Sequence, residues 1–424
     1  MTGWPKNKSS MVTKITRSLL IPCLLAIAAT QPGCWDQREV ERLGIVLATA
    51  VETAPEGKIR IIVQNVDPSA MKGGVGGGGG GGVSGEAGKP YRNRSAEGDT
   101  IFDAVRDLSR QTPRQLFFAH NQVIIISEKL AQGRGIAEVM DFFERNPQIR
   151  RTTWVLVGKG DLTSLLDEPG RIERTPAQRI FGIISERALT SQYGVKRLGN
   201  FLEMMESEGS QPFTAIIERK QNIARPDEQR ATQQEGHTSE PHQNITMSGT
   251  AVFRRDKMVG QLDPKESRGL LWVRGEVKGG IIDISAPGGK RQVSLEILRS
   301  STRLEPGIRD GRISMTIKIK EESNLVETTA PLDLTKPETV ERLEKLLAGA
   351  IRGEVESALA KAQQEYRADV FGFGEEIHRK YPRQWKEIKD TWSDIFPGVE
   401  VEVQVDAKIR RTGLVTKPVQ PKQR

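Results

Sequence analysis

The sequence predicts an α+β protein with three domains, built of mixed β-sheets packed with helices, in which one long helix backs the C-terminal sheet. Short runs rich in valine and isoleucine alternate with segments of helical period in the first half of the chain. One long apolar stripe of helical spacing then lies between further strand-like runs near the end. The length, 424 residues, also suggests roughly two to four domains.

Composition and charge narrow the class of protein. Hydrophobic residues make up 36% of the chain and charged residues 28%, which is typical of a globular body and argues against several membrane spans. The formal net charge of +8 favours contact with membrane headgroups, acidic polymers or nucleic acid, although a solvated basic surface explains it equally well. The four histidines are scattered and both cysteines lie near the N-terminus, so we expect neither a metal site nor a cofactor.

The N-terminal segment, residues 1–33, has the composition of a secretory signal peptide. Lysines and an arginine precede the apolar run 19–30, which is too short to span a bilayer. Met11 is an alternative start, because the signal is complete without the residues before it. The signal ends at Gly33 and Cys34, a small residue followed directly by a cysteine.

The residues around Cys34 resemble a bacterial lipoprotein signal. The resemblance implies cleavage after Gly33 and transfer of a diacylglycerol group to the Cys34 thiol. Two acyl chains hold a protein at a bilayer where one does not, since each buried methylene contributes about 0.8 kcal/mol. Gln31 departs from the pattern, which usually has leucine at that position. The alternative is a secreted protein with a free thiol at Cys34.

The first expected domain, residues 34–195, is of the α/β type because strand-like and helix-like segments alternate along it. Within it, the segment 71–94 is predicted to be a flexible loop, since it contains a long run of consecutive glycines. It is not a phosphate-binding loop, because Pro90 stands where a serine or threonine hydroxyl is needed. The expected strands are 43–48, 59–63, 123–126 and 153–157, and the expected helices are 100–111 and a segment with Ile136, Val139, Met140 and Phe143 on one face.

The second expected domain is formed by residues 196–285. Its segment 218–244 is polar and almost free of large apolar residues, so we expect an exposed excursion there. A hairpin is expected next, at 249–260. Asp263 and Pro264 then predict the start of a helix, since an acidic N-cap and a proline at the first position both suit a helix N-terminus.

The third expected domain, residues 286–413, contains a sheet backed by the longest helix, and a basic tail, 414–424, follows it. The helix is predicted to begin at a capping box from Thr335 to Glu338. A final strand is expected at 399–405, where valine occupies every second position. Other strands are expected at 281–284, 293–298 and 313–319, and the apolar stripe of the helix comprises Val340, Leu343, Leu347, Ile351, Val355, Leu359 and Ala362.

The sequence contains no recognisable catalytic constellation. It has neither a Gly-x-Ser-x-Gly elbow nor a His-Glu-x-x-His zinc motif. Lipidation would remove Cys34 as a nucleophile, and the segment from Phe371 to Gly374 lacks the third glycine of a dinucleotide fingerprint. We therefore expect that the protein is not an enzyme and has no catalytic, cofactor-binding or metal-binding residues.

Five segments, in order along the chain, carry a resemblance to a known family. They are Gly33 to Val40, Met140 to Arg150, Gly249 to Phe253 with Leu262 to Trp272, Ala368 to Gly374 with Tyr381, Pro382 and Trp385, and Ile409 to Gly413. Together they resemble the Ger(x)C family of germination lipoproteins, the C subunits of spore germinant receptors. The resemblance extends from Cys34 to about Gly413, and the differences lie in loops, which tolerate change.

The resemblance implies a receptor subunit that is anchored to the outer face of the spore inner membrane and acts as a scaffold or adaptor. Its implied partners are two integral-membrane proteins, the A and B subunits, with which it responds to small nutrients. Nucleic acid is not an expected partner. The candidate partner contacts are Trp35, Asp36, Arg38 and Glu39 beside the anchor, and the basic end with Arg410 and Arg411, although surface solvation explains both groups equally well.

Two other classes of exported protein are alternatives. An extracytoplasmic solute-binding lipoprotein of a transporter would share the signal and the anchor, and it would require a pocket with converging polar groups between two similar lobes. A wall-modifying hydrolase would require an acid/base pair, for which the sequence offers no signature.

Overall fold

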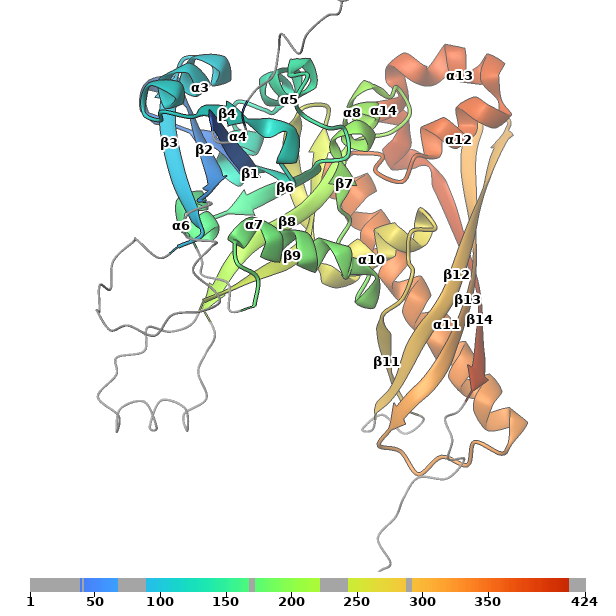
Figure 1. The fold of residues 1–424 in the computed structure, drawn as a ribbon. Helices are drawn as coiled ribbons and strands as arrows, with labels where there is room; N and C mark the ends of the chain where they lie inside the picture. The colour runs from blue at the N-terminus through green and yellow to red at the C-terminus, as the bar shows by residue number, and fades with distance from the viewer. Residues whose placement is uncertain are drawn as a thin grey trace, which may run out of the picture. The chain divides into compact units, whose positions relative to one another are not determined.

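The computed structural model describes Glu39 and residues 42–67, 89–167, 172–221, 243–286 and 292–411. The chain divides into two compact units, Met1–Leu43 and Gly44–Arg424. The elements described below lie in the second unit, apart from the first residue of the first strand. That unit contains two mixed β-sheets and the helices packed on them (Figure 1).

The larger sheet has ten strands among the described residues. They are β1 (Leu43–Thr53), β2 (Ile59–Val66), β3 (Tyr91–Gly98), β4 (Gln115–Phe117), β5 (Val123–Ser127), β6 (Trp154–Lys159), β7 (Lys196–Arg197), β8 (Phe213–Gln221), β9 (Gln243–Arg254) and β10 (Lys257–Leu262). The main order is β10-β9-β8-β6-β5-β1-β2-β3, with β4 beside β1 and β7 beside β6. The pairs β1–β5, β5–β6 and β6–β8 are parallel, and β5 is buried along its whole length, which explains its continuous apolar run.

Helices cover both faces of the larger sheet (Figure 1). They are α3 (Ile101–Arg110), α4 (Glu128–Gln132), α5 (Ala137–Arg145), α6 (Leu162–Asp167), α7 (Pro176–Ser185) and α8 (Leu198–Glu206). On β5, Ile125 packs in one buried cluster with α6 and α7, whereas Ile124 and Ile126 pack in the other cluster with α3, α4, α5 and α8. This division follows from the alternation of side chains along a strand.

The smaller sheet has four strands among the described residues, in the order β11-β12-β13-β14. They are β11 (Ile281–Ser285), β12 (Gln292–Arg309), β13 (Arg312–Thr328) and β14 (Glu400–Arg411). β12 and β13 form a long hairpin whose turn residues, Asp310 and Gly311, both have positive φ, as a tight two-residue turn requires. β14 pairs in parallel with β13, so that Val401 lies opposite Met315.

One long helix backs this smaller sheet (Figure 1). α11 (Pro337–Ala360) buries its apolar stripe in the same cluster as the inward-facing residues of β13, among them Met315 and Ile317. α10 (Pro264–Val273) crosses α11 at Gly269, where an added Cβ would lie 2.0 Å from the carbonyl oxygen of Glu354. Only glycine allows the two backbones to approach so closely.

Short helices and turns complete the chain. α12 (Phe373–Lys380), α13 (Pro382–Ile388) and α14 (Trp392–Ile395) carry aromatic side chains that pack together, with the Trp385 and Trp392 rings 5.6 Å apart. Short 3₁₀ turns lie at Pro55–Gly57, Phe118–His120, Arg187–Leu189, Lys389–Thr391 and Phe396–Gly398, and a π turn lies at Lys361–Tyr366.

The predicted fold class is confirmed: mixed sheets are packed with helices, and one long helix backs the C-terminal sheet. The predicted strands and hairpin are present, and Asp263 caps α10 through a complete capping box with Glu266. The division into 34–195, 196–285 and 286–413 stays a prediction. The strands β8, β9 and β10, from the expected second domain, continue the sheet that the expected first domain begins.

Three details of the prediction are wrong. Residues 91–94, which are expected in the glycine loop, begin β3 and pair with β2. Residues 71–88 of that loop lie outside the described part. The ends of the predicted excursion 218–244 belong to β8 and β9, while 222–242 lie outside it. The predicted capping box of α11 is absent, because Lys336 takes the N-cap position and the Thr335 hydroxyl donates to Asp333 instead.

Candidate functional site

The predicted lipidation and contact residues lie almost entirely outside the part of the chain that the structure describes. These residues are Gly33, Cys34, Trp35, Asp36 and Arg38, and the tail 414–424 lies outside it as well. Glu39 is described: it is exposed, and its carboxylate lies 3.5 Å from the Arg42 guanidinium. Cleavage after Gly33, lipidation of Cys34 and the contact role therefore stay predictions.

The basic end of the last strand is bound to the sheet surface. Arg410 lies 2.6 Å from the Glu322 carboxylate, and Arg299 binds the same carboxylate through two nitrogens at 2.7 and 2.8 Å. The hydrogen bonds from Arg410 and Arg299 lower the pKa of Glu322 to about 2. Arg411 lies opposite Asn324 on β13. Arg410 is thus part of an ion-pair cluster on the sheet, and its role toward a partner stays a prediction.

The segment Met140–Arg150 borders an apolar hollow of about 830 Å³ on the surface. Met140 and Phe143 point into the core, whereas Phe142 lines the hollow together with Phe102 of α3, which is 57% exposed. The charged residues at its edge are paired, as Asp141 is with Arg145. The segment therefore combines a core role with an apolar surface feature.

The segment Leu262–Trp272 forms what we call the sealed junction, made of Arg268, Trp272 and Glu354. Arg268 binds both oxygens of the Glu354 carboxylate, and the Trp272 indole nitrogen donates to one of them at 3.0 Å. A further nitrogen of Arg268 donates to the carbonyl oxygen of Ile281 at 2.7 Å. Only 5% of the Arg268 side chain and 10% of the Glu354 side chain are exposed. This junction fixes α10 against α11.

The segment Ala368–Gly374 is organised around the buried carboxylate of Asp369. Its oxygens accept hydrogen bonds from the backbone N–H groups of Gly372, Phe373 and Gly374 and from the Trp392 indole, at 2.9 to 3.1 Å. Burial nevertheless raises the pKa of Asp369 to about 6. The carbonyl oxygen of Asp369 also accepts from the backbone N–H of Gln211 at 2.7 Å. Asp369 therefore ties the C-terminal helices to the chain that leads into β8.

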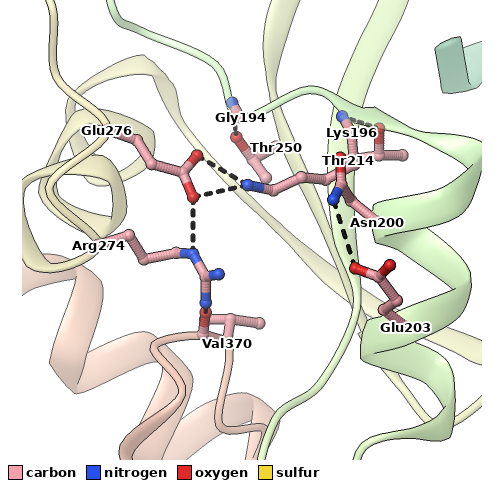
Figure 2. A network of polar contacts seen from close by, with 9 residues as sticks. All are labelled: Gly194, Lys196, Asn200, Glu203, Thr214, Thr250, Arg274, Glu276 and Val370. Atoms are coloured by element: carbon pink, nitrogen blue, oxygen red, sulfur yellow. Dashed lines mark hydrogen bonds and ion pairs between the residues drawn. The ribbon is translucent and has the colours of Figure 1, made fainter. Parts of the chain in front are cut away.

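A further ion-pair cluster, which we call the open junction, consists of Lys196, Arg274 and Glu276 (Figure 2). The Lys196 ammonium group lies 2.7 Å from both oxygens of Glu276, and Nε of Arg274 lies 2.9 Å from one of them. Nη1 of Arg274 also donates to the carbonyl oxygen of Val370. Two segments that are far apart in the sequence therefore meet at the Glu276 carboxylate, and Arg274 connects them to a third at Val370.

Residues of β8 hold the two cations of the open junction in position. The backbone N–H of Lys196 donates to the Thr214 hydroxyl, and this hydroxyl donates to the carbonyl oxygen of Val155. The cationic groups of Lys196 and Arg274 lie 4.5 and 5.2 Å from the centroid of the Phe213 ring, within the range of cation–π attraction. The two cations are thus held by an aromatic surface as well as by the carboxylate.

Burial and charge have opposite effects on the ionisation of this cluster. Burial lowers the pKa of Lys196, although Glu276 beside it acts in the opposite direction. Burial alone would raise the pKa of Glu276, but Lys196 and Arg274 together lower it below its ordinary value. Glu276 therefore remains a carboxylate at neutral pH and is bound by two cations.

Two cavities border the open junction. One, of about 500 Å³, is lined by Lys196, Glu276 and the turn after α7. The other, of about 670 Å³, is lined by Arg274, Gly372 and charged residues of α12. Their volumes are in the range of small-molecule sites. The cavities beside it distinguish this junction from the sealed one.

No helix in the described part of the chain is both long and apolar enough to cross a membrane. The described residues also contain no group of three or more histidine, cysteine, aspartate or glutamate side chains that could hold a metal ion. The expected absence of catalysis stays a prediction.

Comparisons with known proteins identify the family to which the chain belongs. A model described as the N-terminal domain of a spore germination protein matches residues 36–219, and a model described as spore germination B3/GerAC like, C-terminal, matches residues 248–413. Both models describe proteins of spore germination, and together they cover most of the chain. The chain belongs to the Ger(x)C family of spore germination proteins, as the five segments predicted.

Individual relatives extend over nearly the whole chain. Spore germination protein KC of Bacillus subtilis (strain 168) is 27% identical over 96% of this chain and 98% of its own. Spore germination protein YndF of the same bacterium is 28% identical over 96% of this chain and 99% of its own. The crystal structure of the GerBC protein, 20% identical, has a TM-score of 0.54 and covers 86% of this chain and 97% of its own, which shows a common fold.

Proposed function

We propose that the protein is the lipid-anchored C subunit of a nutrient germinant receptor and acts there as a scaffold for two integral-membrane subunits, A and B. The observation that supports this most strongly is the match of both germination models, in chain order, to residues 36–219 and 248–413. Relatives that cover nearly the whole chain are also named as spore germination proteins. The resemblance of the five segments to germinant-receptor C subunits supplies the finer assignment.

The anchor in this proposal is diacylglycerol on Cys34, which would hold the protein at the outer face of the spore inner membrane. Only eight residues lie between Cys34 and Leu43, where β1 begins, and such a segment spans at most about 30 Å. Tethering would confine the subunit to the membrane plane and raise its effective concentration toward its partners without any new contact. The net charge of +8 would add attraction to anionic headgroups.

The two cysteines provide a matched pair of variants for testing the anchor. Cys34→Ala removes the proposed lipidation site, whereas Cys23→Ala changes a cysteine within the signal. We expect Cys34→Ala to move the protein from the membrane to the soluble fraction of spores and to weaken nutrient-triggered germination. Cys23→Ala should do neither. A Cys34→Ala protein that stays in the membrane and germinates normally would refute the anchor.

The scaffold role is tested by identifying the proteins that co-purify with the chain. Purification of the tagged, full-length chain from detergent-solubilised spore membranes should recover two multi-span or membrane-bound subunits in stoichiometric amounts. If the chain is recovered alone under conditions that keep other membrane complexes intact, it is not a receptor scaffold, whether or not Cys34 is lipidated.

The solute-binding alternative is less well supported. It requires two similar lobes around a pocket, whereas the two sheets of the described part have ten and four strands in different orders. Calorimetry of the protein against amino acids, sugars and nucleosides separates the two functions, because a transporter's binding protein should bind one of them tightly on its own.

A further inference from the structure

The 500 Å³ cavity beside Lys196 has an excess of positive charge that no contact within the fold balances. Glu276, the one acidic residue that lines it, is already bound by Lys196 and Arg274. Three further cations line the cavity, Arg187, Arg197 and Lys278, and none of them has an ion pair among the described residues. The cavity therefore offers several cations to an anion from outside the chain.

Two of these cations are arranged on an aromatic wall. The guanidinium carbons of Arg187 and Arg197 lie 5.2 and 4.9 Å from the centroid of the Trp154 ring, and Trp154 is only 7% exposed. Nη1 of Arg187 also donates to the carbonyl oxygen of Ile184 at 3.1 Å. Contact with the ring orients each guanidinium, which has five N–H donors, and leaves most of those donors available. Planar guanidinium groups suit carboxylate and phosphate oxygens.

The rest of the wall is mixed, with the polar residues Ser185, Ser191 and Asn200 beside an apolar part. Val195, Leu271 and the buried Tyr193 and Trp154 side chains line it. The Tyr193 hydroxyl donates to the carbonyl oxygen of Ile183 at 2.8 Å, so its polar end is already satisfied. Apolar walls with a few converging polar groups are the usual composition of a small-molecule site.

We propose that this cavity binds a small organic anion. Its carboxylate or phosphate group binds Arg187, Arg197 and Lys278, and its apolar part packs against Trp154 and Leu271. Arg187 and Arg197 belong to the part matched by the N-terminal model, and Leu271 and Lys278 to the part matched by the C-terminal model. A bound anion therefore contacts both parts of the chain at once. This inference is independent of the anchor and of the receptor partners.

The test is titration calorimetry of the full chain with three probes. Benzoate carries the charge and the apolar ring, benzyl alcohol carries the ring without the charge, and inorganic phosphate carries the charge without the ring. We expect benzoate to bind at least fivefold more tightly than either of the others. Benzyl alcohol binding as tightly as benzoate overturns the role of the cations, and phosphate binding as tightly overturns the organic part. No binding of benzoate overturns a soluble organic anion as the ligand of this cavity.

Variants assign the binding to this cavity. Arg197→Gln and Arg187→Gln should each weaken benzoate binding at least fivefold, and because both side chains are exposed, neither change should lower the melting temperature. Arg312→Gln, an equal change of charge at an exposed arginine that does not line the cavity, should leave binding unchanged. Equal affinities of the wild type and both cavity variants would overturn the proposal.

A lipid headgroup is the other source of such an anion. Flotation of the full chain with phosphatidylglycerol or phosphatidylcholine vesicles distinguishes it from a soluble ligand. If Arg197→Gln abolishes binding to phosphatidylglycerol vesicles while benzoate does not bind the wild type, a headgroup occupies the cavity and the soluble ligand is excluded.

Discussion

The sealed and open junctions use similar chemistry in different surroundings. In each, one carboxylate is bound by a cation from a distant segment and by a second N–H donor. In the sealed junction the carboxylate of Glu354 is 10% exposed and lies where two helix backbones touch. In the open junction Glu276 is 32% exposed and borders a cavity. The comparison indicates that burial, rather than the ion pair itself, separates a purely structural contact from one that a ligand can reach.

The largest effect is expected at the helix crossing of the sealed junction. Gly269→Val places a Cβ where only 2.0 Å separates it from the Glu354 carbonyl oxygen, so α10 and α11 must move apart. We expect the free energy of unfolding to fall by about 4 kcal/mol or more, as with severe overpacking and backbone clashes. Chemical denaturation followed by circular dichroism measures it.

A glycine on α11 provides the control. A Cβ on Gly349 meets no atom within 4 Å, and Gly349 is exposed. Gly349→Ala should therefore stabilise the protein by about 0.5 to 1 kcal/mol through helix propensity. If Gly269→Val were tolerated as well as Gly349→Ala, the close crossing would be wrong.

The charge of the sealed junction is the next target. Glu354→Gln leaves the buried Arg268 cation without a carboxylate, although an amide oxygen remains to accept its hydrogen bonds. Removing one partner of a buried pair costs about 3 kcal/mol. The exposed Glu341 on the same helix is the comparison, and Glu341→Gln should change the midpoint of denaturation little. Equal midpoints for the two variants would show that the junction contributes no stability through its charge.

Glu321 provides a third case beside Glu354 and Glu276. It is a buried carboxylate with no ion pair among the described residues. Burial raises its pKa from 4.5 to about 8, so the folded state holds the proton more tightly than the unfolded state. Glu321 should therefore make the free energy of unfolding fall as the pH rises between 4.5 and 8, and Glu321→Gln should remove this contribution.

The window from pH 6 to 8 isolates Glu321. Asp369, whose pKa is also raised, to about 6, contributes a fall of the same sign mainly at lower pH. Across this window we expect the wild type to lose about 2 kcal/mol relative to Glu321→Gln. Parallel pH profiles of the two proteins would contradict the raised pKa.

The smallest effect is expected at the open junction. Lys196→Met keeps the aliphatic contact with Phe213, and Arg274 still neutralises Glu276. We expect a loss of only about 1 kcal/mol in thermal denaturation, since Glu276 is partly solvated. Lys278→Met, at an exposed lysine, should leave the melting temperature unchanged. A loss as large as that of Glu354→Gln would show that the two junctions do not differ.

The sequence predicts a helix or strand well where residues that are close together in the chain determine it. The alternation from Ile313 to Ile319 predicted β13, and Asp263 with Pro264 predicted the start of α10. β12 was predicted too short, because Pro306 and Gly307 lie within it. The register places β11 only against the first residues of β12, so Pro306 lies on an edge, where its missing N–H breaks no pairing.

The open junction could not be predicted because its partners are 80 residues apart. Lys196 follows Val195 and precedes Arg197, a context that fits a solvated strand end equally well. Arg274 and Glu276 follow α10 in a polar turn, where charged residues are common. Glu276 binds Lys196 only because the fold brings β7 beside that turn.

The parallel pairing of β14 with β13 has a consequence for synthesis and truncation. β14 begins 72 residues after β13 ends, so β13 emerges well before its partner strand during synthesis or export. Until then β13 presents an open edge that includes Met315, Ile317 and Ile319, the kind of surface on which chains aggregate. A premature stop before residue 400 would therefore produce an aggregation-prone protein rather than a slightly shortened one.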